Sequence, residues 1–138
     1  MPSNHKNKTL ATLLALVGGV VGAHRFYLGG ARDRWGWLHL ASVAVAAMVA
    51  VLAPAQNPFF KVLPLLVSGI AACIEALVIG LLADDKWDAA HNAGSGRQSR
   101  SSWPLAVLLV ATLMGGAVLV IATIARLFDL LYTGGAYG

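Results

Sequence analysis

Three apolar runs, each slightly longer than 20 residues, constrain this chain more than any other feature. They cover residues 35–55, 62–83 and 104–125. A helix rises about 1.5 Å per residue, so each run can cross the roughly 30 Å hydrocarbon core of a bilayer. Of the 138 residues, 58% are hydrophobic and only 12% are charged, which is more apolar surface than one soluble core could hide. We therefore expect an all-α, polytopic membrane bundle.

A shorter apolar run over residues 9–22 follows a polar and basic N-terminal stretch. As a helix it covers about 21 Å, less than the full hydrocarbon core. The arrangement imitates a secretory signal, with Val21 and Ala23 at the spacing of a cleavage site. The next residues are His-Arg-Phe-Tyr rather than the start of a soluble domain, which favours a retained helix over 9–23. The sequence thus predicts four transmembrane helices, the first one short.

Residues 22–30 form a polar and aromatic segment bounded by glycines, between the first two apolar runs. Gly22 and Gly29 permit backbone turns without the steric cost of a Cβ atom. Phe26 and Tyr27 are expected to hold the turn at the membrane interface, where aromatic side chains are enriched. The segment is therefore predicted to be a tight turn that joins two helices.

Glu75 lies inside the third apolar run, nine residues before Asp84. An ionisable group at that depth is costly and usually faces protein or water with a partner. We expect Arg25, helped by His24 or Tyr27, to meet Glu75 and lock the helices together. The alternative is that Arg25 binds lipid phosphate while Glu75 pairs elsewhere or is protonated.

Sites for catalysis, cofactors or metals are not indicated. His39 has no second His, Cys or carboxylate three or four positions away on its helix, so we expect it to contact a helix or headgroups rather than a metal. Cys73 is expected to be a buried, inert thiol. No paired carboxylates, nucleophile elbow or phosphate loop suggests an enzyme. The basic residues form no clustered face, which argues against nucleic-acid binding.

The longest polar stretch, residues 84–102, separates the third and fourth long runs. Its first half is predicted to form a short amphipathic helix at the interface, capped by Asp84 or Asp85 and anchored by Trp87. Residues 93–103 are rich in Gly and Ser and are expected to be a flexible linker. An additional transmembrane helix over 104–128 follows.

Four spans would place both termini on one side of the membrane, with the turn and the 84–103 loop on the other. Six of the ten Lys and Arg residues would then lie on the loop side and four on the side of the termini. The positive-inside rule places the side with more Lys and Arg in the cytoplasm. The sequence therefore predicts a cytoplasmic turn and loop. Arg126 and Asp129, three residues apart, are expected to pair at the far end of the last helix.

The motif GxHRFYLG after a short apolar run resembles the signature of the TM-two domain family, small membrane modules of two helices joined by a short loop. Residues 75–92, EALVIGLLADDKWDAAHN, are similar to the ending of bacterial members. There, an acidic residue in the second helix precedes an acidic, tryptophan-containing tail. The resemblance implies a membrane domain over 1–92, with helices at about 9–23, 35–55 and 62–83, and a bacterial inner (plasma) membrane location. The residues singled out for structure or interaction are His24, Arg25, Phe26, Tyr27, Gly29, Glu75, Asp84, Asp85 and Trp87.

Two functions fit this pattern. The first is a non-catalytic interaction, assembly or regulatory subunit of a membrane complex, with the lipid bilayer, other membrane proteins or further copies of itself as partners. Its small size and glycine-lined helices suit that role. The second is a small transporter or proton-conducting protein, with Glu75, His39 and His24 as relay groups.

Overall fold

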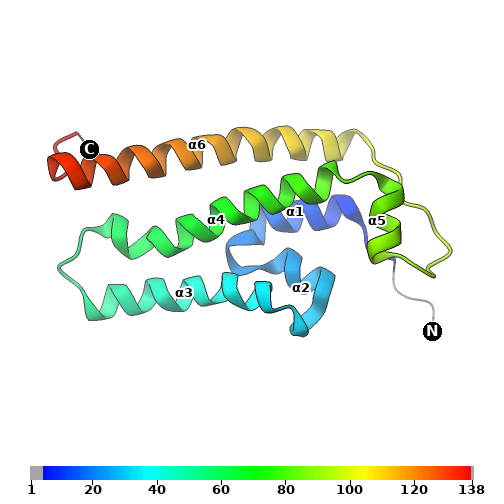
Figure 1. The fold of residues 1–138 in the computed structure, drawn as a ribbon, viewed down its shortest axis with the longest axis horizontal. Coiled ribbons are helices and arrows are strands. Elements are labelled where there is room, and N and C mark those ends of the chain that lie inside the picture. The colour runs from blue at the N-terminus through cyan, green and yellow to red at the C-terminus, as the bar shows by residue number, and fades with distance from the viewer. Residues whose placement is uncertain (1–4, 138) are drawn as a thin grey trace.

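The computed structural model describes residues 5–137 and is all-helical (Figure 1). Residues 1–4, the start of the predicted membrane domain, lie outside the described part. Three helices are long and apolar enough to span a membrane, and a shorter apolar helix precedes them, which confirms the expected bundle. The helices are α1 (Lys8–Gly18), α2 (Ala23–Gly29), α3 (Arg34–Leu52), α4 (Pro58–Leu81), α5 (Asp84–His91) and α6 (Trp103–Thr133), with single 3₁₀ turns at Gly19–Val21 and Gly30–Arg32.

The first helix reaches only the middle of the bundle. α1 begins at Lys8, whose side chain pairs with Asp84 just after α4. Beyond the other end of α1, the carbonyl oxygen of Val20 accepts a hydrogen bond from Ser68 Oγ at 2.8 Å. Ser68 lies near the middle of α4, so the tip of α1 stops about halfway along its neighbour.

The chain then reverses and returns to the end it came from. Gly22 adopts a left-handed backbone conformation with φ 76°, which favours glycine. α2 runs back beside α1 (Figure 1). At its end, the carbonyl oxygen of Tyr27 accepts a hydrogen bond from Lys6 Nζ at 3.0 Å. α1 and α2 therefore form a re-entrant hairpin, which enters and leaves by the same end of the bundle.

This path corrects the predicted placement of the termini. The backbone N–H of Lys6 donates to Asn92 Oδ1 at 2.7 Å, so the start of the described chain lies beside α5 and the 84–103 loop. The end of α6 lies at the opposite end of the bundle (Figure 1). The prediction that both termini share one side is wrong, because the first apolar run turns back as a re-entrant hairpin and does not reach the far end of the bundle (Figure 1).

Close backbone packing holds the hairpin between α3 and α4. A Cβ atom on Gly19 would lie 2.3 Å from the Cβ of Ala72, and one on Gly22 would lie 2.8 Å from the carbonyl oxygen of Gly36. A Cβ atom on Gly36 would lie 2.9 Å from the ring of Phe26. Small residues at helix contacts in membranes allow this approach. The glycine-lined faces expected from the sequence are therefore used inside the chain.

α5 caps the end of the bundle where the hairpin enters. Trp87 is fully buried, and its Nε1–H donates to the carbonyl oxygen of Lys6 at 3.1 Å. The expectation that Trp87 anchors α5 at the interface is therefore wrong, because the ring is enclosed by protein. Ala83, rather than Asp84 or Asp85, occupies the N-cap position of α5.

Residues beyond α5 are tied to it by serines. The Ser99 hydroxyl donates to Asp88 Oδ1 at 2.6 Å, and the Ser101 hydroxyl donates to Asp84 Oδ1 at 2.6 Å. The contacts of these serines do not measure motion, so the expected flexibility of residues 93–103 stays a prediction. At the far end of α6, Arg126 and Asp129 form the expected ion pair at 2.5 Å.

Candidate functional site

Glu75 lies at the centre of a polar cluster where α2, α3 and α4 meet. Its carboxylate is 20% exposed. Arg25 Nε donates to Glu75 Oε2 at 3.1 Å, and Arg25 Nη2 donates to Oε1. The predicted contact between Arg25 and Glu75 is therefore confirmed, and it joins the returning arm of the hairpin to α4.

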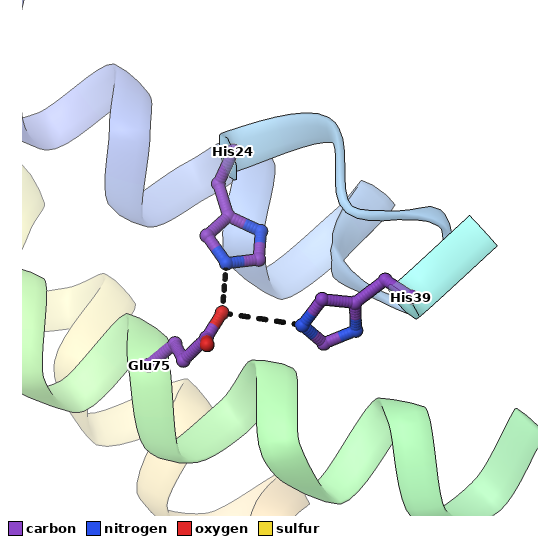
Figure 2. A group of neighbouring side chains, drawn as sticks. All are labelled: His24, His39 and Glu75. Atoms are coloured by element: carbon purple, nitrogen blue, oxygen red, sulfur yellow. Dashed lines mark hydrogen bonds and ion pairs between the residues drawn. The ribbon is translucent and has the colours of Figure 1, made fainter. Parts of the chain in front are cut away.

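Two histidines approach the same carboxylate oxygen (Figure 2). His24 Nε2 contacts Glu75 Oε2, and His39 Nε2 lies 3.3 Å from that oxygen. The imidazole rings meet edge to face, with centroids 5.6 Å apart. His24 is fully buried and His39 is 7% exposed. Three elements thus direct one donor atom each to a shared point, and these atoms lie within 4.8 Å of one another.

Ser68 supports the cluster from behind His39. Its Oγ lies 2.7 Å from His39 Nδ1, and its hydroxyl hydrogen is donated to the carbonyl oxygen of Val20. A hydroxyl has only one hydrogen, so Ser68 must accept in its contact with the imidazole. His39 Nδ1 therefore carries the hydrogen of the neutral ring.

His24 has a less complete environment. Its Nδ1 is the one buried side-chain nitrogen or oxygen without a hydrogen-bond partner in the part of the chain that the structure describes. This pattern fits a ring whose Nε2–H donates to Glu75 and whose Nδ1 is an acceptor without a donor. His24 and His39 then present opposite hydrogen-bonding characters to the same carboxylate.

Local structure explains how these side chains come together. The reversal at Gly22 starts α2, which brings Arg25 back towards α4. Asp33 caps α3, because its Oδ1 accepts from the backbone N–H of Trp35 at 2.8 Å and of Gly36 at 3.1 Å. This start places His39 in the second turn of α3. Hairpin reversal and helix cap together determine the geometry of the cluster.

The other residues singled out from the sequence lie outside the cluster. Tyr27 accepts a hydrogen bond from the backbone of Asn7 through its hydroxyl oxygen, at 2.9 Å. Phe26 packs edge to face against Trp37, with ring centroids 5.6 Å apart. Asp85 is exposed on α5.

Further outlying residues are held by local packing. Gly29 packs closely against Asp33, because a Cβ atom added at Gly29 would lie 2.8 Å from the Cβ of Asp33. Asp84 and Trp87 belong to the end of the bundle where α5 packs. Asp84 pairs there with Lys8, whose side chain is 5% exposed.

Sequence reasoning grouped His39 with Glu75 and His24 only as relay groups of a transporter; it did not predict the contact between His39 and Glu75, and it missed Ser68. The test for a metal ligand on His39 considered positions three and four residues away on one helix. In the structure these two neighbours both come from α4, 29 positions away for Ser68 and 36 for Glu75. One signal was available in the sequence. Polar side chains are scarce in the apolar runs, and because buried polar groups are nearly always hydrogen-bonded, those few are expected to contact one another.

An apolar cavity of about 550 Å³ opens between α3 and α4 and reaches the cluster. His39, Ser68 and Glu75 form its polar part, and the remaining lining is mostly apolar. The cavity gives one side of the cluster free space, which the hairpin does not fill.

Comparison with known proteins gives one family match, over the N-terminal part of the chain. Residues 4–52 match the TM2 domain, the family whose signature the GxHRFYLG motif resembles. The match covers the hairpin and α3 and ends before α4, which carries Glu75. No curated protein and no solved structure matches the chain. The chain is thus a multi-pass membrane protein with a TM2 domain at residues 4–52.

Proposed function

We propose that this protein is a non-catalytic interaction, assembly or regulatory subunit of a complex in the inner membrane of a bacterial cell. The outward face of α6 is the observation that carries the proposal. This helix has 31 residues and packs against α4 and α1 on one side. Only Leu105, Thr112 and Thr123 are buried along it. α6 therefore presents one long apolar face to its surroundings.

Small residues on that face make it suitable for another transmembrane helix. Ala111, Gly115 and Ala122 are exposed at helical spacing, and a Cβ atom added at Gly115 would meet nothing within 4 Å. Small residues let helix backbones approach closely in a bilayer, where packing rather than hydrophobicity drives association. The occupant that this face fits is a transmembrane helix of a partner protein.

The polar cluster supports a structural role for the TM2 domain. Both oxygens of Glu75 are engaged by Arg25, and the carboxylate also meets two histidines. These contacts join the re-entrant hairpin to α3 and α4. A paired buried charge fixes geometry even where it adds little net stability. The domain then serves as a rigid base from which α6 extends.

Proton conduction is the second candidate, favoured by the continuous chain of contacts from His24 through Glu75 and His39 to Ser68. The chain ends where Ser68 donates to the carbonyl oxygen of Val20, which has no proton to pass on. This end point, in the middle of the bundle, favours the structural role.

The charge distribution supports one orientation. Seven of the ten Lys and Arg residues belong to the end of the bundle that holds the hairpin entrance, α5 and the loop after it, only Lys61 and Arg126 belong to the other, and Arg25 lies in the cluster between them. This bias is stronger than the six-to-four division expected from four spans. By the positive-inside rule, the hairpin entrance and the 84–103 loop face the cytoplasm, and the end of α6 faces outward.

Blue-native electrophoresis of membranes extracted with a mild detergent tests the proposed function. The protein should migrate within a heavier assembly. Gly115→Leu should shift it to a lighter band, because the new side chain blocks close approach without touching the protein's own core. Val110→Leu is the matched control, since Val110 is 57% exposed on the same helix but, five residues before Gly115, lies on a different side of it.

A sharp monomer band for the unaltered protein would overturn the interaction role. The second candidate has its own test in liposomes. Proton flux through the reconstituted protein that disappears in Glu75→Gln would favour conduction, and flux that is unchanged by this substitution would remove it.

A further inference from the structure

We propose that His24, His39 and Glu75 form a binding site for one divalent transition-metal ion of the zinc class. The ligand atoms are Nε2 of each histidine and Oε2 of the carboxylate, which lie within 4.8 Å of one another. They come from α2, α3 and α4, and both imidazoles point to the same carboxylate oxygen (Figure 2). Imidazole nitrogens with one carboxylate oxygen are a common ligand set for zinc with an open fourth position.

The tautomer of His39 is the first argument for a cation. Ser68 accepts the hydrogen of His39 Nδ1, because its own hydrogen is donated to Val20. The neutral ring of His39 therefore directs the lone pair of Nε2 into the cluster. Histidines that bind metals almost always donate the other ring N–H to such a partner, which fixes the tautomer and the orientation of the ring.

The contact between His39 and Glu75 is the second argument. Nε2 of the neutral ring and the ionised Oε2 are both hydrogen-bond acceptors, and they lie 3.3 Å apart. With His39 neutral and Glu75 ionised, neither atom carries a hydrogen, so they cannot form a hydrogen bond with each other. A metal ion bound to both atoms converts a repulsive contact into two coordination bonds, and it needs no change in the positions of α3 and α4.

Arg25 competes with the metal ion for the carboxylate of Glu75. Its Nη2 holds Oε1 while its Nε shares Oε2 with the histidines. A metal ion on Oε2 displaces Nε and leaves the contact at Oε1. Two positive groups then lie near one carboxylate, so Arg25 lowers the affinity for the metal, and its removal should raise that affinity.

His24 is the weakest of the three ligands. To coordinate through Nε2, the neutral ring carries its hydrogen on Nδ1, which has no acceptor among the described residues. Its loss should therefore reduce the affinity less than the loss of His39. The cavity of about 550 Å³ beside Glu75 and His39 has room for a water molecule as the fourth ligand.

Metal binding to the purified full-length protein in detergent tests the site. After treatment with a chelator and its removal, the protein should bind one Zn²⁺ per chain, measured by elemental analysis. Co²⁺ should give the visible absorption of a tetrahedral site. His39→Asn and Glu75→Gln should abolish both signals. His91→Asn is the matched control, since His91 lies on α5, outside the cluster, and it should leave both signals unchanged.

Two further variants distinguish a metal site from a purely structural cluster. Ser68→Ala should weaken Zn²⁺ binding by about 10- to 100-fold, because it frees the ring orientation and tautomer of His39. Arg25→Gln should tighten binding, although it removes an ion pair that holds the hairpin. Size-exclusion chromatography verifies that each variant is folded. If Glu75→Gln does not fold, Zn²⁺ binding by Ser68→Ala and Arg25→Gln tests the proposed metal site.

Three results would overturn the proposal. The first is Zn²⁺ or Co²⁺ binding no greater than that of His39→Asn. The second is binding that Ser68→Ala and Arg25→Gln leave unchanged. The third is a nitrogen NMR spectrum at neutral pH in which both ring nitrogens of His39 stay protonated when Zn²⁺ is added, which would show that a proton, not a metal, lies between His39 and Glu75.

Discussion

Lys8 and Asp84 lie 76 positions apart in the chain and form an ion pair where the re-entrant hairpin meets the end of α4. The Lys8 ammonium also donates to the carbonyl oxygen of Leu82 at 2.8 Å. Asp84 accepts further hydrogen bonds from the backbone and the hydroxyl of Ser101. One carboxylate therefore connects the start of α1, the α4–α5 junction and the segment before α6.

This arrangement predicts a specific dependence of stability on pH. Hydrogen bonds from Lys8 and then from Ser101 lower the pKa of Asp84 from 3.8 to about 2. A carboxylate whose pKa is lowered by folding contributes stability above its unfolded pKa, and this contribution is lost as the pH falls through the folded value. The unaltered protein should be more stable than Asp84→Asn above about pH 4, and the difference should shrink as the pH falls and disappear below about pH 2. Thermal unfolding in detergent across this range measures it, and a constant difference would contradict it.

Close packing of the hairpin predicts that Gly19→Ala destabilises the protein. The new Cβ atom would lie 2.3 Å from the Cβ of Ala72, and both positions are in packed backbone contact. Overpacking of this kind costs about 1–3 kcal/mol. Adding Ala72→Gly should restore much of the loss, whereas Gly115→Ala, on the open face of α6, should have little effect. Thermal unfolding of the four proteins provides the test, and equal stability of the single and double variants would refute it.

The ion pair between Arg25 and Glu75 predicts partial rescue by exchange of charges. Arg25→Glu and Glu75→Arg should each lower the folded yield in membranes, because each leaves a charge without its partner. The double variant should recover part of the yield. Recovery should be incomplete, since His24 and His39 would then face a guanidinium instead of a carboxylate. A double variant no better folded than either single one would show that pairing is not what matters.

The hairpin also predicts which parts of the chain are reached from each side. In a Cys73→Ser background, His5→Cys and Arg97→Cys should react with a membrane-impermeant maleimide from the same side. Tyr137→Cys should react only from the other side, because α6 ends at the opposite end of the bundle. Labelling of His5→Cys and Tyr137→Cys from one common side would support four spans instead.

The sequence was sufficient to predict the long helices, and it offered the central ion pair as one of two alternatives, the other being Arg25 bound to lipid phosphate. Apolar runs of more than 20 residues have few alternatives to membrane helices, because lipid leaves no partner for exposed backbone groups. Glu75 needed a partner, and Arg25 was the cation placed by the turn at a similar depth. Both predictions depend on strong local constraints that a single sequence displays.

The path of α1 and the contacts of His39 could not be predicted in the same way. A run of 14 apolar residues suits both a short span and a helix that turns back, and the choice depends on packing of Gly19 and Gly22 against distant residues. His39 joins the cluster through contacts 29 and 36 positions away. Trp87 likewise resembles an interfacial residue until the N-terminal segment covers it. These features arise from tertiary contacts, which spacing along one helix does not encode.

The half-depth hairpin makes the two halves of the bundle unequal in width. Near the N-terminal end, α1 packs against α4 and α6 with α2 beside it, whereas beyond the tip at Val21 only α3, α4 and α6 continue (Figure 1). The protein therefore displaces more lipid from the leaflet next to its N-terminal end than from the opposite leaflet. Its cross-section is a wedge, so copies gathered in one patch of membrane would occupy the two leaflets unequally.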